Sequence, residues 1–251
     1  MGEDGPIAVA YVIWIEKAGP IMTVEINYRA WMKQQLIWGE RTRGRGLVWT
    51  TDADWFINDP LGHKPHLHED ASEILFLAQG SMEIEIGATK AVYRAGDFLL
   101  VPPDKYHDYW LAGDEHVCLF VVVAPNHKYA RWKTGDFPPE AHQGAAALVN
   151  VYESDDLPSN EHFLCQKIAL APGESDPVTY CELQDRIIYV LSGTAHLSLN
   201  TLSGPLAEHQ YQYVPATCPH EISNRGYLPL SYISLTITDP MTAHGTEPDD
   251  D

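Results

Sequence analysis

Apolar residues in this chain occur in short runs or alternate with polar residues, and turn residues separate the segments. Residues 7–15 and 117–125 are nearly continuous apolar runs, which are typical of buried strands. Residues 73–80 end at a glycine turn, and residues 96–107 contain a Pro-Pro corner. Segment 25–38 follows a helical period poorly, so helix and strand both remain open there. The pattern predicts a protein built mainly from β-strands.

The second half of the chain repeats the pattern of the first. Apolar and alternating segments begin again at residue 145. The sequence LSG at 191–193 aligns with AQG at 78–80, and VPATCPH at 214–220 aligns with VPPDKYH at 101–107. A repeat of this size indicates duplicated folding units, so we expect two similar domains.

Four potential metal ligands lie close together in the first half. His66 and His68 are two residues apart, so on a strand both side chains point to one face. Glu73 opens the next apolar strand. His107 follows Pro102 and Pro103, where a central strand must break because proline cannot donate to the ladder. Three strands can thus bring ligands to one barrel interior.

This spacing resembles the two conserved motifs of the cupin superfamily, G(x)5HxH(x)3–4E(x)6G and G(x)5PxG(x)2H(x)3N. The matching positions are His66, His68, Glu73, Gly80, Gly96, Pro102 and His107. The departures are Pro60 at the opening glycine, Asp104 at the inner glycine and Leu111 at the terminal asparagine. The resemblance implies that the three histidines and the glutamate bind one divalent metal inside a small β-barrel.

The fold class expected from this resemblance is all-β, with two cupin-type jelly-roll barrels in one chain and few short helices. We expect an N-terminal barrel with an intact metal site at 1–125 and a connection at 126–144. A degenerate C-terminal barrel should occupy 145–240, and a disordered acidic tail should occupy 241–251.

The second copy lacks the ligand set in the simplest alignment. The ligand positions fall on Thr179, Cys181 and Arg186, and only His220 is retained. A register shifted by one residue would offer Asp185 instead, and Cys181 with His220 could then form a partial site. We expect a structural copy without metal, because a positive arginine repels a cation.

Three imidazoles and one carboxylate leave positions open on an octahedral metal, which is typical of catalytic sites. Such donors suit Fe(II), Mn, Ni, Cu or Zn. By resemblance to two-barrel cupins we expect a non-haem Fe(II) dioxygenase that cleaves a ring or C–C bond. The alternative is an O2-independent cupin in which the metal acts as a Lewis acid, namely an isomerase, decarboxylase, lyase or aminohydrolase. A third reading is a non-enzymatic cupin that binds a small molecule.

Strand alternation predicts which other side chains face the site. Tyr109 is two residues from His107, and Lys64 is two residues from His66, so each shares a strand face with a predicted ligand. Both are catalytic candidates, and the alternative for each is a solvated position at the rim of the barrel. The predicted substrate pocket consists of Leu75, Leu77, Gln79 and Leu111. Such a pocket suits a small, partly apolar or aromatic molecule.

Composition narrows the classes of partner. The net charge is −19, from 16 Lys and Arg against 35 Asp and Glu, which argues against nucleic acid as a partner. The N-terminal sequence lacks a basic start and its apolar run stops at Glu16, so we expect neither a signal peptide nor a membrane span. Four cysteines without a CxxC pair indicate a reduced, cytoplasmic protein. A homodimer is a further expectation.

Overall fold

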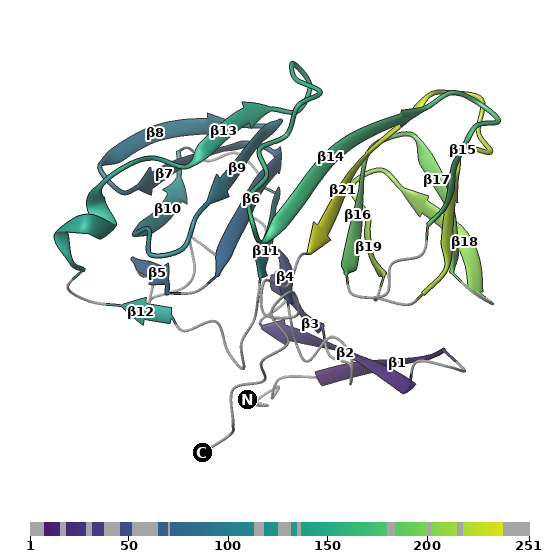
Figure 1. The fold of residues 1–251 in the computed structure, drawn as a ribbon, viewed down its shortest axis with the longest axis horizontal. Helices are drawn as coiled ribbons and strands as arrows, with labels where there is room; N and C mark the ends of the chain where they lie inside the picture. Colours follow the sequence, from purple (N-terminus) through teal and green to yellow (C-terminus); the bar gives the residue numbers. More distant parts are fainter. Residues whose placement is uncertain are drawn as a thin grey trace, which may run out of the picture. The chain divides into compact units, whose positions relative to one another are not determined.

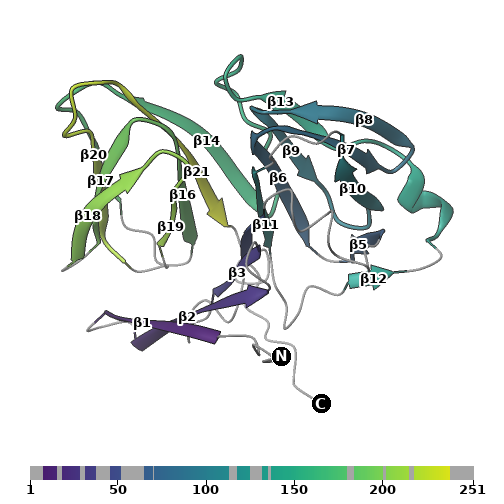
Figure 2. The ribbon, with the colours of Figure 1, turned by 180° about the vertical axis from the view of Figure 1, so that it is seen from behind.

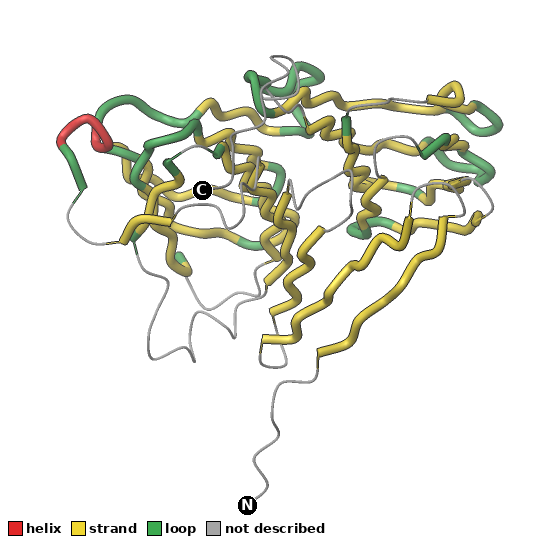
Figure 3. Tube along the Cα trace, turned by 60° about the horizontal axis from the view of Figure 1, so that its bottom comes forward, coloured by secondary structure: helices red, strands yellow, loops and turns green. Residues whose placement is uncertain are grey.

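The computed structural model describes residues 8–15, 19–28, 32–37, 46–51, 65–69, 71–112, 118–124, 132–134, 137–179, 184–199, 202–214 and 218–237. These residues form strands connected by loops and turns (Figure 3), and the helix among them is the single 3-10 turn η1 (Pro139–His142). Within the same ranges, no helix has the length and hydropathy that a membrane crossing needs. The prediction of an all-β chain with few short helices is confirmed.

The chain divides into two compact units, whose main parts are Arg43–Ser154 and Asp155–Asp251. The strands up to residue 154 are β1 (Ala8–Ile15), β2 (Gly19–Tyr28), β3 (Met32–Ile37), β4 (Gly46–Thr51), β5 (His66–His68), β6 (Ser72–Gln79), β7 (Ser81–Ile86), β8 (Thr89–Arg94), β9 (Asp97–Val101), β10 (His107–Leu111), β11 (Cys118–Ala124), β12 (Trp132–Thr134) and β13 (Ala147–Asn150). The later strands are β14 (Phe163–Leu170), β15 (Ser175–Thr179), β16 (Asp185–Ser192), β17 (Thr194–Leu199), β18 (Leu202–Ala207), β19 (Tyr211–Val214), β20 (His220–Ser223) and β21 (Leu230–Ile237). The ambiguous segment 25–38 therefore contains strands.

The first barrel consists of two facing antiparallel sheets (Figure 1). One sheet has the order β1-β2-β3-β4-β11-β6-β9-β13, and the other has the order β12-β5-β10-β7-β8. On β7, Met82, Ile84 and Ile86 are buried while the residues between them are half-exposed, so this strand presents one face to the core. Both faces of β6 are buried except at its last residue, Gln79, which is exposed.

The second barrel repeats this arrangement (Figure 2). Its sheets have the orders β14-β21-β16-β19 and β15-β20-β17-β18. These correspond strand by strand to β4-β11-β6-β9 and β5-β10-β7-β8 of the first barrel. The buried core contains apolar residues from several of these strands, among them Ile188, Val190, Leu197 and Ile222. The predicted duplication is therefore visible in the topology as well as in the sequence.

Two segments that the sequence pattern placed outside the first barrel pair with it. β12 lies in the expected connection and pairs with β5, with Trp132 opposite His68. β13 lies in the range expected for the second barrel, yet it pairs with β9 from Ala147 opposite Leu100 to Asn150 opposite Asp97. The turn before β9 is closely packed: a Cβ at Gly96 (φ +93°) would come within 2.8 Å of both Asn150 side-chain oxygen and nitrogen.

Candidate metal centre

The predicted ligands lie on three strands of the first barrel that meet at one end of its interior. His66 and His68 begin and end β5, and His66 pairs directly with His107 at the start of β10. Glu73 is the second residue of β6 and pairs with Val101 at the end of β9. Because β5 carries its histidines at alternate positions, both side chains face Glu73.

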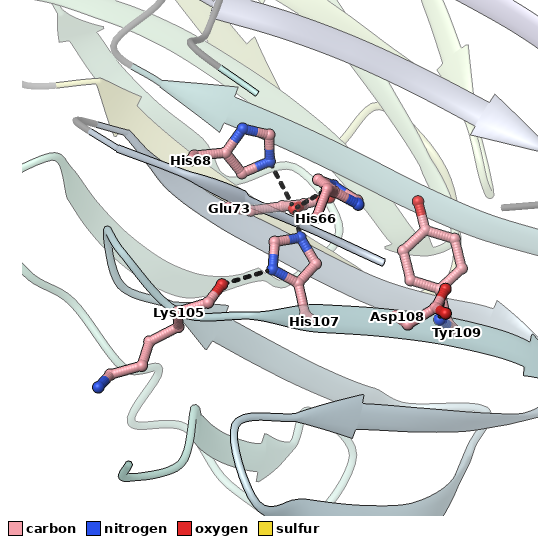
Figure 4. Close-up of polar contacts among 7 residues, drawn as sticks. All are labelled: His66, His68, Glu73, Lys105, His107, Asp108 and Tyr109. Atoms are coloured by element: carbon pink, nitrogen blue, oxygen red, sulfur yellow. Dashed lines mark hydrogen bonds and ion pairs between the residues drawn. The ribbon is translucent and has the colours of Figure 1, made fainter. Parts of the chain in front are cut away.

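The four side chains converge on a single buried point (Figure 4). One potential ligand atom from each lies within 4.8 Å of all the others. The Nε2 atoms of His107, His68 and His66 lie 2.5, 3.0 and 4.0 Å from Glu73 Oε2. All four residues are at most 2% exposed. No second cluster with this ligand chemistry occurs among the residues that the structure describes.

The cluster is organised electrostatically around the Glu73 carboxylate. Burial alone would raise the pKa of Glu73, but the imidazoles of His107 and His68 outweigh burial and hold this pKa well below its ordinary value. Burial alone would lower the pKa of His107, and the Glu73 carboxylate raises it instead. The carboxylate is therefore ionised, as a metal ligand must be.

The residues present fit a divalent cation. Glu73 Oε1 is buried and has no hydrogen-bond partner among the described residues, which is costly for a charged oxygen unless a cation binds it. Three neutral imidazoles with one carboxylate are donors that divalent transition metals accept. His66, His68, Glu73 and His107 would hold the ion.

The tautomer of His107 is set by a backbone contact that sequence reasoning missed. His107 Nδ1 lies 2.9 Å from the carbonyl oxygen of Lys105 and donates to it, which leaves Nε2 facing the cluster (Figure 4). The loop also contacts a second predicted ligand, because the backbone N–H of Asp104 donates to the carbonyl of His68 at 2.7 Å. Asp104 has φ +60°, the left-handed conformation for which the related motif has glycine.

The other predicted site residues divide into three groups. Tyr109 is 2% exposed and points to the same side of β10 as His107 (Figure 4), and burial raises its pKa well above the ordinary value, with the charges of Glu73 and Asp108 adding to the shift. Leu75 and Leu77 are fully buried in the barrel core. Gln79 has the expected parity but is exposed at the end of β6, so it does not line the interior. Lys64 and the side chain of Leu111 lie outside the described residues.

The corresponding point of the second barrel holds an arginine instead of a carboxylate. Arg186 is the second residue of β16 and pairs with Val214, as Glu73 pairs with Val101. Thr179 pairs with His220, as His66 pairs with His107. This is the simplest register predicted from the sequence. Cys181, the remaining position, lies outside the described residues.

Arg186 is surrounded by partners. Its Nη2 donates to Asp176 Oδ2 at 3.1 Å, and its Nε donates to Ser234 at 2.6 Å. His220 Nε2 accepts from Nη1 at 2.9 Å, and Tyr232 also donates to Asp176. A buried cation with a carboxylate partner therefore fills the place that the ligand cluster occupies in the first barrel.

One family model matches the segment that contains the cluster. Residues 59–123 match the model of the cupin domain, in the part of the chain where the motif spacing predicted a cupin barrel. No curated protein matches the chain in sequence.

Solved structures share the two-barrel cupin fold at low sequence identity. Salicylate 1,2-dioxygenase from Pseudoaminobacter salicylatoxidans is 12% identical, with a TM-score of 0.60 over 80% of this chain and 72% of that chain. AerE from Microcystis aeruginosa is 13% identical, with a TM-score of 0.55 over 93% and 98%. Oxalate decarboxylase from Bacillus subtilis, which has Mn(II) centres, is 11% identical, with a TM-score of 0.53 over 95% and 78%.

Proposed function

We propose that this chain is a metal-dependent dioxygenase that uses Fe(II) to cleave a ring or C–C bond of a small, partly apolar or aromatic substrate. The observation that carries the proposal is the buried convergence of His66, His68, Glu73 and His107 within 4.8 Å. Three nitrogen donors and one oxygen donor leave coordination positions open, which is typical of catalytic sites. When bound, Fe(II) supplies reactivity toward dioxygen and Lewis acidity toward substrate oxygens.

The surrounding protein would contribute water exclusion and a proton. Leu75, Leu77 and Val121 are fully buried in the core cluster of the same barrel, so the site has a low-dielectric apolar boundary on that side. The raised pKa of Tyr109 keeps its phenol protonated at neutral pH. A protonated hydroxyl can donate a hydrogen bond to a substrate oxygen on which negative charge develops. We assign this role to Tyr109.

The relatives in fold support an aromatic substrate class by analogy. A structure of salicylate 1,2-dioxygenase in complex with gentisate, 11% identical to this chain with a TM-score of 0.60, places an aromatic acid in a protein of the same two-barrel fold. One fold hosts many chemistries, so the proposal depends on the cluster and not on the fold alone.

A second candidate is O2-independent Lewis-acid chemistry, in particular decarboxylation or isomerisation. The observation that favours it is Tyr109, because a buried protonated phenol beside an ionised carboxylate suits proton transfer. Oxalate decarboxylase, with its Mn(II) centres, is a neighbour in fold whose name describes such a reaction.

Metal content and oxygen uptake test the two candidates against each other. The protein is purified under argon, its bound metal is measured, and O2 consumption is followed with a panel of phenolic and 1,3-dicarbonyl compounds. Iron with substrate-dependent O2 uptake supports the dioxygenase. Manganese, nickel or zinc with turnover under argon supports the alternative. A full-length chain that retains no divalent metal after reconstitution would contradict both.

A further inference from the structure

The loop Pro102–Tyr106, which leads into β10, is attached to two predicted ligands through its backbone. Asp104 N–H donates to the carbonyl of His68 at 2.7 Å, and the carbonyl of Lys105 accepts from His107 Nδ1 at 2.9 Å. This loop therefore orients the His107 ring and contacts the strand that carries His66 and His68.

The other side of the loop is held by residues 137–144, which we call the clamp segment and which include η1. The Lys105 ammonium donates to the backbone carbonyls of Gln143, at 2.5 Å, and Glu140, at 3.3 Å. Gln143 is the C-cap residue of η1, and the Glu140 carbonyl also accepts from the backbone N–H of Gln143 at 3.1 Å, so the ammonium joins the loop to the closing turn of η1.

Tyr106 strengthens the attachment next to Lys105. Its backbone N–H donates to the carbonyl of Ala141 at 3.3 Å, and its ring lies 4.9 Å from Phe137 and 5.0 Å from His142 between centroids. Ala141 is fully buried, so the middle of the clamp segment is packed against the barrel.

Gly87, in the turn between β7 and β8, lets the clamp segment approach closely. Its N–H donates to the carbonyl of Tyr106 at 2.8 Å. A Cβ at this position would lie 2.8 Å from the carbonyl oxygen of Gly144 and 3.3 Å from that of His142, and φ is +58°. Glycine therefore permits contact between the turn, the loop and the clamp segment.

The second barrel shows which of these contacts occur in both barrels and which occur only beside the intact ligand cluster. His220 Nδ1 lies 3.1 Å from the carbonyl of Cys218, again two residues earlier, so the backbone contact is common to both barrels. The side chain at that position is a buried cysteine, whose Sγ contacts the carbonyl of Pro219 at 3.7 Å. A cationic anchor is therefore found at this position only in the barrel with the intact cluster.

We propose that Lys105 is a positioning residue for the candidate metal centre: its ammonium fixes the loop to the clamp segment, and its carbonyl thereby holds His107 with Nε2 toward the metal. The inference rests on the proposed function, because it requires metal binding by the four-residue cluster. Groups that orient metal-ligating histidines typically contribute about 10–100-fold to metal affinity. Lys105 acts on His107 through its own backbone, so we expect an effect at the lower end, about 10-fold.

Co(II) binding to the full-length protein tests this role, with affinity measured by chelator competition and ligand geometry by the visible absorption of the bound ion. Lys105→Met keeps the aliphatic stem and the backbone carbonyl but removes the ammonium. We expect about 10-fold weaker Co(II) binding, an altered absorption spectrum and apo-protein melting close to that of the wild type. Lys105→Arg retains a cationic donor and should restore most of the affinity.

The matched control is Lys167→Met, which removes an ion pair of 2.8 Å with Asp155 in the second unit and should leave Co(II) affinity unchanged. Phe137→Ala removes the ring contact between the clamp segment and Tyr106 without changing any residue of the loop, and it should shift affinity in the same direction as Lys105→Met. Affinity and spectrum equal to wild type in both Lys105→Met and Phe137→Ala would overturn the inference. In that case His107→Ala tests the metal site separately from the role of Lys105. If this variant abolishes Co(II) binding, the four-residue metal site is supported and only the positioning role of Lys105 is rejected.

Discussion

The two barrels share their strand order and differ in the charge they place at one interior position. In the first barrel that position is Glu73, with three imidazoles around it. In the second it is Arg186, with Asp176 and His220 as partners. One framework therefore accommodates either an anionic cluster that can bind a cation from solution or a position whose cation is a side chain of the protein.

The difference in charge at this position also determines whether a cation from solution would stabilise each barrel. Glu73 Oε1 is buried without a hydrogen-bond partner among the described residues, so an external cation would lower the free energy of the folded first barrel. Arg186 donates to three different side chains, and its charge is compensated by Asp176. The charge of Arg186 is thus compensated within the second barrel, and any added cation would meet a guanidinium.

The largest expected effect is the loss of metal from the first barrel. The double variant His66→Ala/His68→Ala removes two of four donors, so metal content should fall from a single ion per chain to nearly none, with loss of activity. Elemental analysis of protein reconstituted under argon measures this. His220→Ala, which removes the corresponding imidazole of the second barrel, should retain the full metal content. Two ions per chain in the wild type would contradict the comparison.

Glu73→Gln tests the charge that distinguishes the barrels. The amide keeps the shape of the side chain but removes the only formal negative charge among the donors, so turnover at matched metal loading should fall about 10–100-fold. Kinetics at saturating metal measure the change, and the surface variant Glu83→Gln is the control, since Glu83 forms an exposed ion pair with Lys90. Unchanged turnover at full loading would mean that Glu73 is not a ligand.

Arg186→Met tests the internal cation of the second barrel. Removing the guanidinium leaves Asp176 and the neighbouring polar groups without their main partner, and breaking such a pair costs about 3 kcal/mol of unfolding free energy. Denaturant unfolding monitored for the second unit measures this cost. Metal content should not change. A second bound ion in this variant would show that the arginine alone had excluded metal.

Sequence reasoning recovered those features of the site that strand periodicity determines. The two-residue spacing of His66 and His68 fixed their shared face, and the repeat fixed the equivalence of Glu73 with Arg186. The prediction that Gln79 lines the pocket was wrong, because it is exposed at the end of β6. Alternation along a strand gives the face to which a side chain points, but not the residue at which the strand leaves the barrel.

Other features depend on contacts between distant segments, which no local pattern contains. β13 joins the first barrel because its backbone pairs with β9, although its residues alternate like the start of a second domain. The anchor of Lys105 on Gln143 joins positions 38 residues apart. The sequence did contain a partial indication of the loop conformation before β10. Asp104 stands where the related motif has glycine, and it adopts a positive φ.

His220→Ala should have a moderate effect on stability and none on the metal. The imidazole accepts from Arg186 and donates to the carbonyl of Cys218, so its removal should cost about 1–3 kcal/mol. Metal content and turnover should equal those of the wild type. The rival arrangement, in which Cys181, Asp185 and His220 form a working site, predicts loss of turnover in His220→Ala or Cys181→Ser at unchanged first-site metal.

The smallest expected effect is a change in how stability depends on pH. Burial lowers the pKa of His220 and Arg186 lowers it further, while its hydrogen bond to Cys218 and the charge of Asp176 act in the opposite direction. An imidazole with a folded-state pKa below its unfolded value of about 6.5 binds fewer protons when folded, so its contribution is present above that value and lost as pH falls below it. His220→Gln lacks this group, so its unfolding free energy should decrease less than that of the wild type between about pH 7.5 and 5.5. The two proteins differ only at position 220, and comparing the two slopes therefore isolates His220. Equal slopes of unfolding free energy against pH, measured by urea unfolding, would mean that the Arg186 guanidinium does not keep His220 neutral.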